Sequence, residues 1–560
     1  MSLRRPWRAI CEALAAESVE YVFGLPGNPE LLYNDLADFP EIRPILVRHE
    51  TSAVFMAMAY ARVSGRIGVV HASPGPGMAN LVPGLLEAFY ACSPLVSLVS
   101  AADRNYEGMG VFQETPSLDL ARPVSKWAVR IDLAHRTTWT LERAFHLAQN
   151  GKPGPVFVEI PGDVAGTEAD IPNYRPRVPL RAAGDPALLN AAAGLLARSK
   201  RPVIVAGGGV GLAGAERELV ELAERLDAPV VTTPSGRGSI NEAHRLAFGV
   251  VGLYRTASSA KPYDEADCLL LVGTRMEEFQ SGLWKLLPDA ARLVQVDIDP
   301  FEIGRNVRPD VAVLGDAKLV LAQLVQAVPV AGERPATAEH VLFKERFEQQ
   351  VDEECAPGEG PLKTKQVVHA LNDAFGDFVL VNENGGQDLW SYYCPYVKVT
   401  SERGCVAPAE QTCMGFGVAG AVGAKLARPD AFVVCVTGDG AFQMYLQEMA
   451  TAVQYRAPVA WVVLDNASLG WCKWIQRATG ERYIATDFEA QPDFVRLAEA
   501  YGVHGERVEE PGAVAGAFER AREANEDGVP AVLSCAIDTW DYPQGFTDFH
   551  RDVWGLTLPA

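Results

Sequence analysis

Residues 431–466 read AFVVCVTGDGAFQMYLQEMATAVQYRAPVAWVVLDN, a pattern that predicts one βαβ unit. Its parts are a buried strand, a helix and a second buried strand, expected at residues 431–437, 441–455 and 457–464. Two strands joined by one helix run parallel. Asp439 and Asn466 therefore lie at the same edge of the sheet, where open α/β sheets bind their ligands.

The turn Gly438-Asp439-Gly440 and the later Asn466 suit a hard divalent cation that also holds a diphosphate. A carboxylate and an amide oxygen are ligands that Mg²⁺ accepts. The glycines let the backbone approach phosphate groups, and the next helix points the positive end of its dipole at them. Such a turn is common by itself, so the strand before it and the spacing to Asn466 carry the argument.

Length, composition and charge set the limits of the function. At about 150 residues per domain, 560 residues predict three or four domains. The net charge of −21 argues against nucleic acid and anionic membrane surfaces as partners. Ten scattered cysteines without a metal-binding spacing indicate reduced thiols in a cytoplasmic protein. No apolar run reaches the roughly 20 residues that cross a bilayer, and no signal peptide is expected.

Predicted strands and helices alternate in three segments, so the expected fold class is α/β with three doubly wound parallel-sheet domains. The predicted domains are residues 1–166, 186–330 and 362–538. Residues 167–185, rich in proline and arginine, are expected to be a linker, and residues 338–354 a charged helix. Residues 539–560 form a tail rich in aromatic side chains.

This order of segments, with the Gly-Asp-Gly turn in the third, resembles the thiamine diphosphate (ThDP) enzymes of the acetolactate synthase, benzoylformate decarboxylase and 2-hydroxyacyl-CoA lyase superfamily. The resemblance covers nearly the whole chain and implies pyrimidine-binding, central and diphosphate-binding domains. It implies ThDP and Mg²⁺ as cofactors, with Asp439, Asn466 and the carbonyl of Ser468 as metal ligands. It also implies a homodimer or homotetramer with active sites at the subunit interface.

Three residues of the first segment are catalytic candidates by this resemblance. Glu50 would protonate the cofactor's aminopyrimidine, whose imino form then removes the C2 proton of the thiazolium; a glutamate favoured by a helix dipole is the alternative. His71 matches a histidine that contacts the reacting carbonyl in benzoylformate decarboxylase, or it is a buried strand-end histidine. Gln113, in Phe112-Gln113-Glu114, matches a glutamine that faces the reacting carbon in acetolactate synthases.

Other residues are expected around the cofactor and the substrate. Met414 would support the thiazolium against the pyrimidine ring. Trp471 and Trp474 would make the pocket aromatic, or they pack an amphipathic helix. The further cofactor-binding candidates are Pro26, Ser73, Asn80, Gly386, Gln387, Gly438, Gly440, Ala441, Leu469 and Gly470. The further pocket candidates are Asn28, Phe112, Cys472 and Ile475.

The turns of the central segment resemble a nucleotide-binding domain. Acetolactate synthases hold FAD there, acyl-CoA enzymes hold ADP, and other relatives hold nothing, so all three outcomes stay open. The residues that would contact a nucleotide are Gly208, Gly209, Arg275, Asp297 and Asp316.

Three positions depart from the acetolactate synthase pattern. Gly162 replaces a lysine, Ile475 replaces a tryptophan, and Phe279 replaces the arginine that would receive the second substrate's carboxylate. Loss of that arginine removes a charge-assisted pair of about 1.5–3 kcal/mol. The pattern therefore argues against a role in branched-chain amino-acid biosynthesis.

The expected function is that of a lyase and carboligase that decarboxylates a 2-oxo acid without oxidation and transfers the resulting enamine to a carbonyl acceptor. One alternative is a 2-hydroxyacyl-CoA lyase, which Arg104-Asn105 and a lid-like tail favour. Another is a simple 2-oxo acid decarboxylase of the benzoylformate decarboxylase type. A nucleotide-binding regulatory protein with a decayed site would lack Glu50, Asp439 or Asn466, and all three are present.

Overall fold

The computed structural model describes residues 3–27 and 31–559. Contacts between residues divide the chain into two compact units. Unit 1 comprises Met1–Leu180, Pro408–Pro429 and Tyr445–Ala457, and unit 2 comprises Arg181–Ala407, Asp430–Met444 and Pro458–Ala560. Unit 1 thus gains two helices from the last third of the sequence.

Unit 1 contains a six-stranded parallel sheet in the order β3-β2-β4-β5-β7-β6. Its strands are β2 (Tyr21–Gly24), β3 (Arg43–Leu46), β4 (Gly68–Ala72), β5 (Leu95–Ala101), β6 (Trp127–Arg130) and β7 (Pro155–Pro161). Its helices are α1 (Pro6–Ala16), α2 (Leu31–Leu36), α3 (Glu50–Ser64), α4 (Pro76–Tyr90), α5 (Ser117–Ala121), α6 (Thr137–Gln149), α7 (Gly162–Ala165), α16 (Phe416–Ala427) and α18 (Met449–Tyr455). Buried strands without a polar face explain the continuous apolar runs of this segment.

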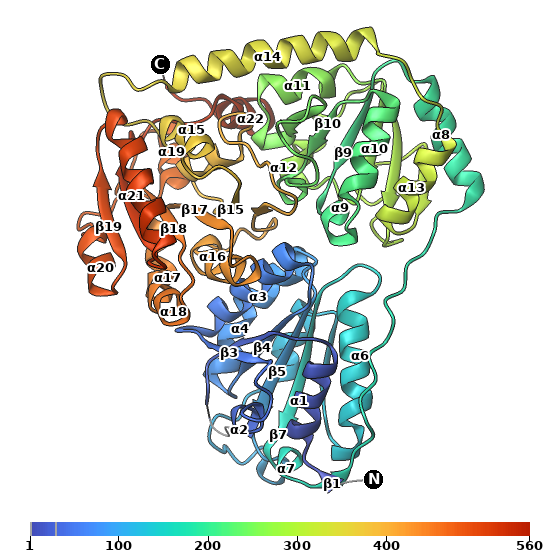
Figure 1. Ribbon diagram of the computed structural model, residues 1–560, viewed down its shortest axis with the longest axis vertical. Helices are drawn as coiled ribbons and strands as arrows, with labels where there is room; N and C mark the ends of the chain where they lie inside the picture. Colours follow the sequence, from blue (N-terminus) through green and yellow to red (C-terminus); the bar gives the residue numbers. More distant parts are fainter. Residues whose placement is uncertain (1–2, 28–30, 560) are drawn as a thin grey trace. The chain divides into compact units, whose positions relative to one another are not determined.

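Helices α3 and α16 are buried on nearly all sides because small residues let them approach closely. A Cβ atom on Gly423 would lie 2.0 Å from the backbone oxygen of Met56, so only glycine fits there. The rings of Phe55 and Phe416 meet edge to face at 5.4 Å. Figure 1 shows α16 lying against α3.

The predicted linker 167–185 contains one regular element that the sequence pattern did not indicate. Strand β8 (Ala169–Asp170) pairs antiparallel with β1 (Leu3–Arg4). The side chain of Arg4 adds a hydrogen bond to the backbone oxygen of Ile171 at 2.6 Å. Strands of two residues carry no readable periodicity, so this pairing becomes visible only in three dimensions.

Unit 2 contains two further six-stranded parallel sheets, in the orders β11-β10-β9-β12-β13-β14 and β16-β15-β17-β18-β20-β19. The elements around the first are α8 (Pro186–Arg198), β9 (Pro202–Ala206), α9 (Gly208–Ala213), α10 (Glu216–Leu226), β10 (Val230–Thr232), β11 (Ala247–Val250), α11 (Ala257–Asp264), β12 (Cys268–Val272), α12 (Glu278–Ser281), β13 (Arg292–Asp297), β14 (Val311–Leu314) and α13 (Ala317–Ala327). The elements around the second are α15 (Thr364–Ala374), β15 (Phe378–Asn382), β16 (Cys405–Val406), β17 (Phe432–Gly438), α17 (Asp439–Tyr445), β18 (Ala460–Asp465), α19 (Gly470–Ala478), α20 (Phe494–Ala500), β19 (His504–Val508), α21 (Val514–Glu526), β20 (Ala531–Ala536) and α22 (Gln544–Trp554).

Two features join the halves of unit 2. Helix α14 (Pro335–Cys355) contacts both α11 and α15, as Figure 1 shows. A buried ion pair lies between the sheets, in which Arg237 donates to Glu242 at 2.7 Å and to the backbone oxygen of Ser391 at 2.6 Å. Glu242 also accepts the backbone N–H of Val399 at 2.7 Å. The charges are thus satisfied by hydrogen bonds, as buried charges require.

The predicted fold class is confirmed, because the three long segments each form a parallel sheet flanked by helices. The βαβ unit at 431–466 is present as β17 and β18, paired through Gly438 and Leu464. Its helix begins at Asp439 rather than at residue 441, and a 3₁₀ turn, Leu446–Glu448, interrupts it before α18.

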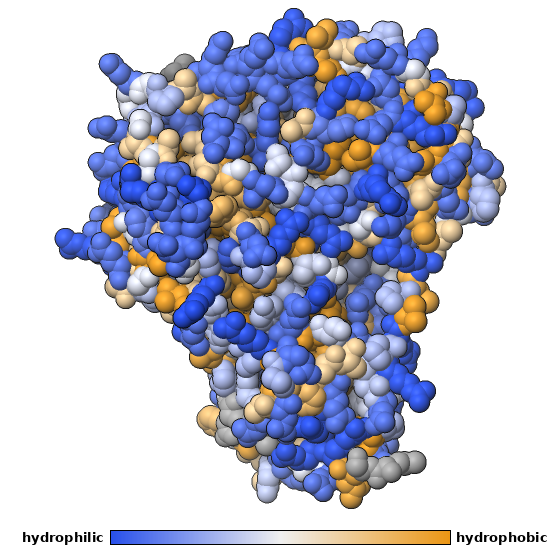
Figure 2. Space-filling view, in the orientation of Figure 1, coloured by the Kyte–Doolittle hydropathy of each residue, from blue (hydrophilic) through white to orange (hydrophobic). Residues whose placement is uncertain are grey.

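The visible face of the molecule is mostly hydrophilic, with scattered apolar residues (Figure 2). Among the described residues, no helix combines the length and apolar character needed to cross a membrane. All ten cysteines are free thiols, and Cys472 is exposed.

Candidate active site

The three predicted metal ligands lie together at the carboxyl edge of the third sheet. The backbone N–H of Asn466 donates to the Asp439 carboxylate at 3.2 Å. The amide oxygen of Asn466 accepts both the N–H and the hydroxyl of Ser468 at 3.0 Å. The amide nitrogen of Asn466 donates to Gln387 at 2.8 Å. The Asp439 carboxylate after β17 therefore lies beside the loops that follow the two neighbouring strands, β18 and β15.

Negative charge accumulates at this edge. Burial raises the pKa of Asp439 to about 7, and the nearby Asp465 carboxylate also raises it. Burial likewise raises the pKa of Asp388 to about 7, and the charge of Asp439 contributes. Gln491 donates to Asp439 at 2.8 Å and to Asp465 at 2.9 Å. Among residues 3–27 and 31–559, no salt bridge involves Asp439, whereas the neighbouring Asp465 pairs with Arg507 at 3.3 Å. Hard oxygen donors with uncompensated negative charge fit a divalent cation.

The backbone segments beside this cluster approach each other closely. A Cβ atom on Gly386 would lie 2.8 Å from the backbone nitrogen of Trp471 and 3.0 Å from Cα of Gly470. A Cβ atom on Gly440 would lie 3.0 Å from the side chain of Leu469, whereas one on Gly438 would meet nothing within 4 Å. The predicted diphosphate-contacting residues of unit 2 thus share one site with the metal ligands, and Ala441 is buried in α17 behind them.

The aromatic tail packs on the helix that follows Asn466. Trp471 donates its indole N–H to Nε2 of His550 at 3.0 Å, and Nδ1 of His550 donates to the backbone oxygen of Phe546 at 2.7 Å. Trp474 is fully buried, with its ring 4.5 Å from that of His550. The position of Trp474 agrees with the alternative that it packs an amphipathic helix. Phe279 contacts Trp471 with a ring separation of 6.0 Å. Of the other pocket candidates, Ile475 packs on the same core and Cys472 faces outward.

The buried His550 makes stability depend on pH. Burial lowers the pKa of His550 to about 4, below the roughly 6.5 of an unfolded histidine. The unfolded chain therefore binds more protons between these values, and stability falls as pH decreases through that window. We expect wild-type protein to lose about 2 kcal/mol through this group between pH 7.5 and pH 5.

Urea unfolding followed by tryptophan fluorescence at both pH values measures this loss. His550→Gln keeps a hydrogen-bond acceptor but cannot titrate, so its stability should fall less than that of the wild type. An equal fall in both proteins would contradict the prediction.

In unit 1, Glu50 starts α3 and lies buried. Its carboxylate accepts the side-chain N–H of Asn80 at 3.0 Å. A Cβ atom on Gly77 would lie 3.3 Å from Glu50 and 2.5 Å from the hydroxyl of Ser73. On the other side of Ser73, a Cβ atom on Gly27 would lie 2.1 Å from its Cβ, so the loop that carries Pro26 reaches the same place.

Several buried polar atoms of unit 1 have no hydrogen-bond partner among the described residues, and two of them belong to catalytic candidates: Nε2 of His71 and Oε1 of Gln113. His71 contacts the Tyr33 hydroxyl at 3.3 Å, and burial lowers its pKa to about 3, so it is neutral. Gln113 lies against Gly75 in the left-handed conformation, with φ of +59°. Unpaired polar atoms and a strained backbone are typical of ligand-binding positions.

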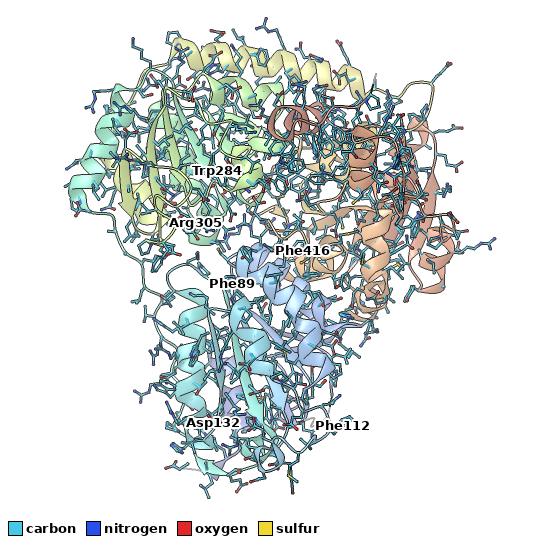
Figure 3. All side chains as sticks on the ribbon, turned by 180° about the vertical axis from the view of Figure 1, so that it is seen from behind. Phe89, Phe112, Asp132, Trp284, Arg305 and Phe416 are labelled. Carbon is cyan, nitrogen blue, oxygen red and sulfur yellow. The ribbon has the colours of Figure 1, made fainter. Side chains whose placement is uncertain are left out.

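Phe112 and Met414 lie apart from these contacts. Phe112 is 71% exposed and lies at the rim of unit 1, as Figure 3 shows. Met414 precedes α16 and is 39% exposed. Asn28 lies outside the described residues.

Comparison with known proteins identifies the family. The model of the thiamine pyrophosphate enzyme N-terminal TPP binding domain matches residues 7–121. The central-domain model matches residues 189–324, and the C-terminal TPP binding domain model matches residues 387–535. The chain is a ThDP-dependent enzyme of the acetolactate synthase superfamily.

Relatives agree with this assignment over almost the full length of the chain. The probable acetolactate synthase large subunit of Methanocaldococcus jannaschii is 35% identical over 548 residues, which cover 95% of this chain and 91% of that protein. The corresponding protein of Methanococcus aeolicus is 34% identical over 556 residues, with the same coverage. The acetolactate synthase isozyme 3 large subunit of Escherichia coli is 33% identical over 543 residues, which cover 94% of each chain.

The nucleotide candidates of this ThDP enzyme lie at the ends of neighbouring strands of the central sheet. Gly208 and Gly209 follow β9, and a Cβ atom on Gly209 would lie 2.7 Å from Cα of Gly273 after β12. Arg275 pairs with Glu277 at 2.9 Å. The other two candidates end β13 and precede α13; they are Asp297 and Asp316.

Sequence reasoning missed four polar residues of the two clusters. Asp388 and Gln491 surround Asp439, and Glu87 and Glu448 are fully buried in unit 1. Glu87 accepts the backbone N–H groups of residues 409 and 413 at 2.5 and 3.0 Å. An acidic residue within an apolar helix was the one available signal for Glu87. No periodicity indicates the other three.

Proposed function

We propose that this protein is a ThDP- and Mg²⁺-dependent carbon–carbon lyase and carboligase that acts on a 2-oxo acid. The observation that carries the proposal is the buried Asp439 carboxylate, which lies beside Asn466 and Ser468 and has no salt-bridge partner among the described residues. The family shares ThDP binding, and this cluster supplies the oxygen donors that a cation bound to a diphosphate requires. The acceptor would be a second carbonyl compound.

Each part of the two clusters has a distinct role in the proposal. Asp439, Asn466 and the carbonyl of Ser468 would hold Mg²⁺, and the close backbone around Gly386 and Gly470 would contact the diphosphate. ThDP, when bound, supplies the stabilisation of carbanion character that the reaction needs.

Unit 1 would supply the proton chemistry and the contacts to the substrate. Glu50, oriented by Asn80, would hold a proton at the aminopyrimidine. Nε2 of His71 and Oε1 of Gln113 would form hydrogen bonds with polar atoms of the substrate. His71 and the Oε1 atom of Gln113 are buried, so they would act where water is excluded.

We also propose a cytoplasmic homodimer or homotetramer with sites at the subunit interface, in line with the family resemblance. The central sheet would hold FAD, ADP or no nucleotide. Denaturing purified protein and recording the visible absorbance of what is released identifies FAD, because among these outcomes only flavin absorbs visible light; chromatography of the released material then distinguishes ADP from no nucleotide.

A 2-hydroxyacyl-CoA lyase is the second candidate function, and one contact argues against it. Arg104 would be available for an acyl-CoA only if it were unpaired. Its Nη2 and Nε atoms instead donate to Asp163 at 2.7 and 2.9 Å, and Nη1 donates to the backbone oxygen of Asp132 at 2.6 Å. Because the structure already gives Arg104 these partners, the motif Arg104-Asn105 alone does not favour an acyl-CoA substrate.

Turnover of purified protein with ThDP and Mg²⁺ tests the proposal. The panel should contain 2-oxo acids with and without aldehyde acceptors, and 2-hydroxyacyl-CoAs. We expect decarboxylation of a 2-oxo acid and a carboligation product. Turnover of acyl-CoAs alone would establish the second candidate, and activity with neither class would contradict both.

A further inference from the structure

Glu448 is a fully buried carboxylate that contacts the segment leading to Glu50. It ends the 3₁₀ turn before α18, within unit 1. Its two oxygens accept the backbone N–H of Arg48 at 3.0 and 3.3 Å. It also accepts the hydroxyl of Thr451 at 2.7 Å. Both donors point at one carboxylate that is closed off from solvent.

The contacted segment is short and sets the direction of α3. Strand β3 ends at Leu46 and α3 begins at Glu50, so Arg48 lies in the middle of a three-residue connection. The hydroxyl of Tyr455 accepts the backbone N–H of Leu46 at 2.7 Å, and His49 caps α3 by accepting the N–H of Thr51 at 3.2 Å. The connection is therefore held by hydrogen bonds at its middle residue and at both flanking elements.

Because the Glu448 carboxylate is buried, losing one of its hydrogen-bond donors would cost free energy. Burial raises the pKa of this carboxyl, while the hydrogen bonds from Thr451 and Arg48 act in the opposite direction. A buried carboxylate without strong donors is costly, and bonds to a charged acceptor are among the strongest in proteins. Moving the Arg48 amide away would leave the carboxylate without its backbone donor. Glu448 thus resists displacement of this one backbone group.

We propose that Glu448 is a positioning residue for Glu50, holding the connection through Arg48 so that the Glu50 carboxyl stays aligned with Asn80. The proposal rests on the proposed function, in which Glu50 serves the aminopyrimidine of ThDP. Glu448 itself acts only through the backbone. An error of about 1 Å in the position of a reacting group can cost about 10²-fold in rate, so the alignment matters.

Three variants test this role. Glu448→Ala removes the acceptor, and Glu448→Gln keeps an amide oxygen for Arg48 and an amide N–H for Thr451. Thr451→Val removes only the hydroxyl. The matched control is Thr138→Val, because Thr138 is also buried in unit 1 and donates to the backbone oxygen of Pro172 at 2.6 Å.

Exchange of the C2 proton of bound ThDP, measured after rapid quenching, is the first readout. We expect Glu448→Ala to slow it by about 10- to 100-fold and Thr451→Val by about 5-fold. Glu448→Gln should stay within about 3-fold of wild type, since one acceptor remains. Thr138→Val should lower thermal stability as Thr451→Val does, with exchange unchanged.

Amide hydrogen exchange of the cofactor-free protein is the second readout. In Glu448→Ala and Thr451→Val, residues 46–52 should exchange faster than in wild type, and Thr138→Val should leave them unchanged. If Glu448→Ala does not fold, the comparison of Thr451→Val with Thr138→Val carries the test. Wild-type C2 exchange in every folded variant at residues 448 and 451, or equal slowing by the two valine variants, would overturn the proposal.

Glu50→Gln in the same assay separates the two claims. Normal exchange in Glu50→Gln would contradict the proposed function itself. Slow exchange in Glu50→Gln together with normal exchange in Glu448→Ala would contradict only the positioning role.

Discussion

Replacing Glu50 with glutamine is expected to slow C2 proton exchange of bound ThDP by about 10²-fold or more, the range of lost acid–base help. Glutamine keeps the shape and can still accept the Asn80 N–H, which lies 3.0 Å from the carboxylate. It cannot deliver a proton to the pyrimidine. ThDP affinity should therefore stay unchanged while the rate of C2 proton exchange falls. Quenched-flow exchange in deuterated buffer measures the rate, and a ThDP titration measures the affinity.

Glu17→Gln is the control for this experiment. Glu17 is a partly buried carboxyl of the same unit that pairs with Tyr174. It precedes β2, at the sheet edge opposite to Glu50, which follows β3. This variant should exchange at the wild-type rate. Wild-type exchange in Glu50→Gln would refute the role given to Glu50.

The second large effect is expected at Asp439. Asp439→Ala removes the one carboxylate among the proposed metal ligands, and ThDP affinity in the presence of Mg²⁺ should fall until activity is lost. Asp493→Ala is the matched control, because Asp493 caps α20 in the same unit by accepting two backbone N–H groups. Asp493→Ala should lower the free energy of unfolding by about 1 kcal/mol and leave ThDP affinity unchanged. Unaltered affinity in Asp439→Ala would contradict the metal assignment.

The two inactive variants together test the proposed assembly. If Glu50 of one subunit serves the Asp439 cluster of its partner, a dimer of Glu50→Gln with Asp439→Ala contains one doubly altered site and one intact site. Random exchange of subunits should restore about a quarter of the wild-type sites. Without recovery, and with exchange verified by mass, each chain would build its own site.

The sequence predicted most reliably those residues whose position follows from one βαβ unit. Asp439 and Asn466 end adjacent strands, so parallel pairing alone brings them together. The start of α17 is two residues earlier than expected, because Asp439 itself forms the first turn. Helix boundaries depend on such local turns, which hydrophobic periodicity does not resolve.

Polar contacts between residues far apart in the chain could not be predicted from the sequence. Glu448 bonds to a backbone group 400 residues away, and Glu87 to one 322 residues away. An acidic residue on a helix usually faces water, and only the fold reveals the backbone donors that bury these two. His550 was likewise hidden, because its partner Trp471 lies on another helix.

Reconstitution of activity with ThDP and Mg²⁺ shows whether this protein depends on both cofactors. Purified protein is treated with a chelator, dialysed, and assayed for 2-oxo acid turnover with ThDP, with Mg²⁺, with both and with neither. We predict activity only when both are restored, because Asp439 and its neighbours would bind the diphosphate through the cation. Full activity of the dialysed protein without either component would contradict a ThDP- and Mg²⁺-dependent reaction.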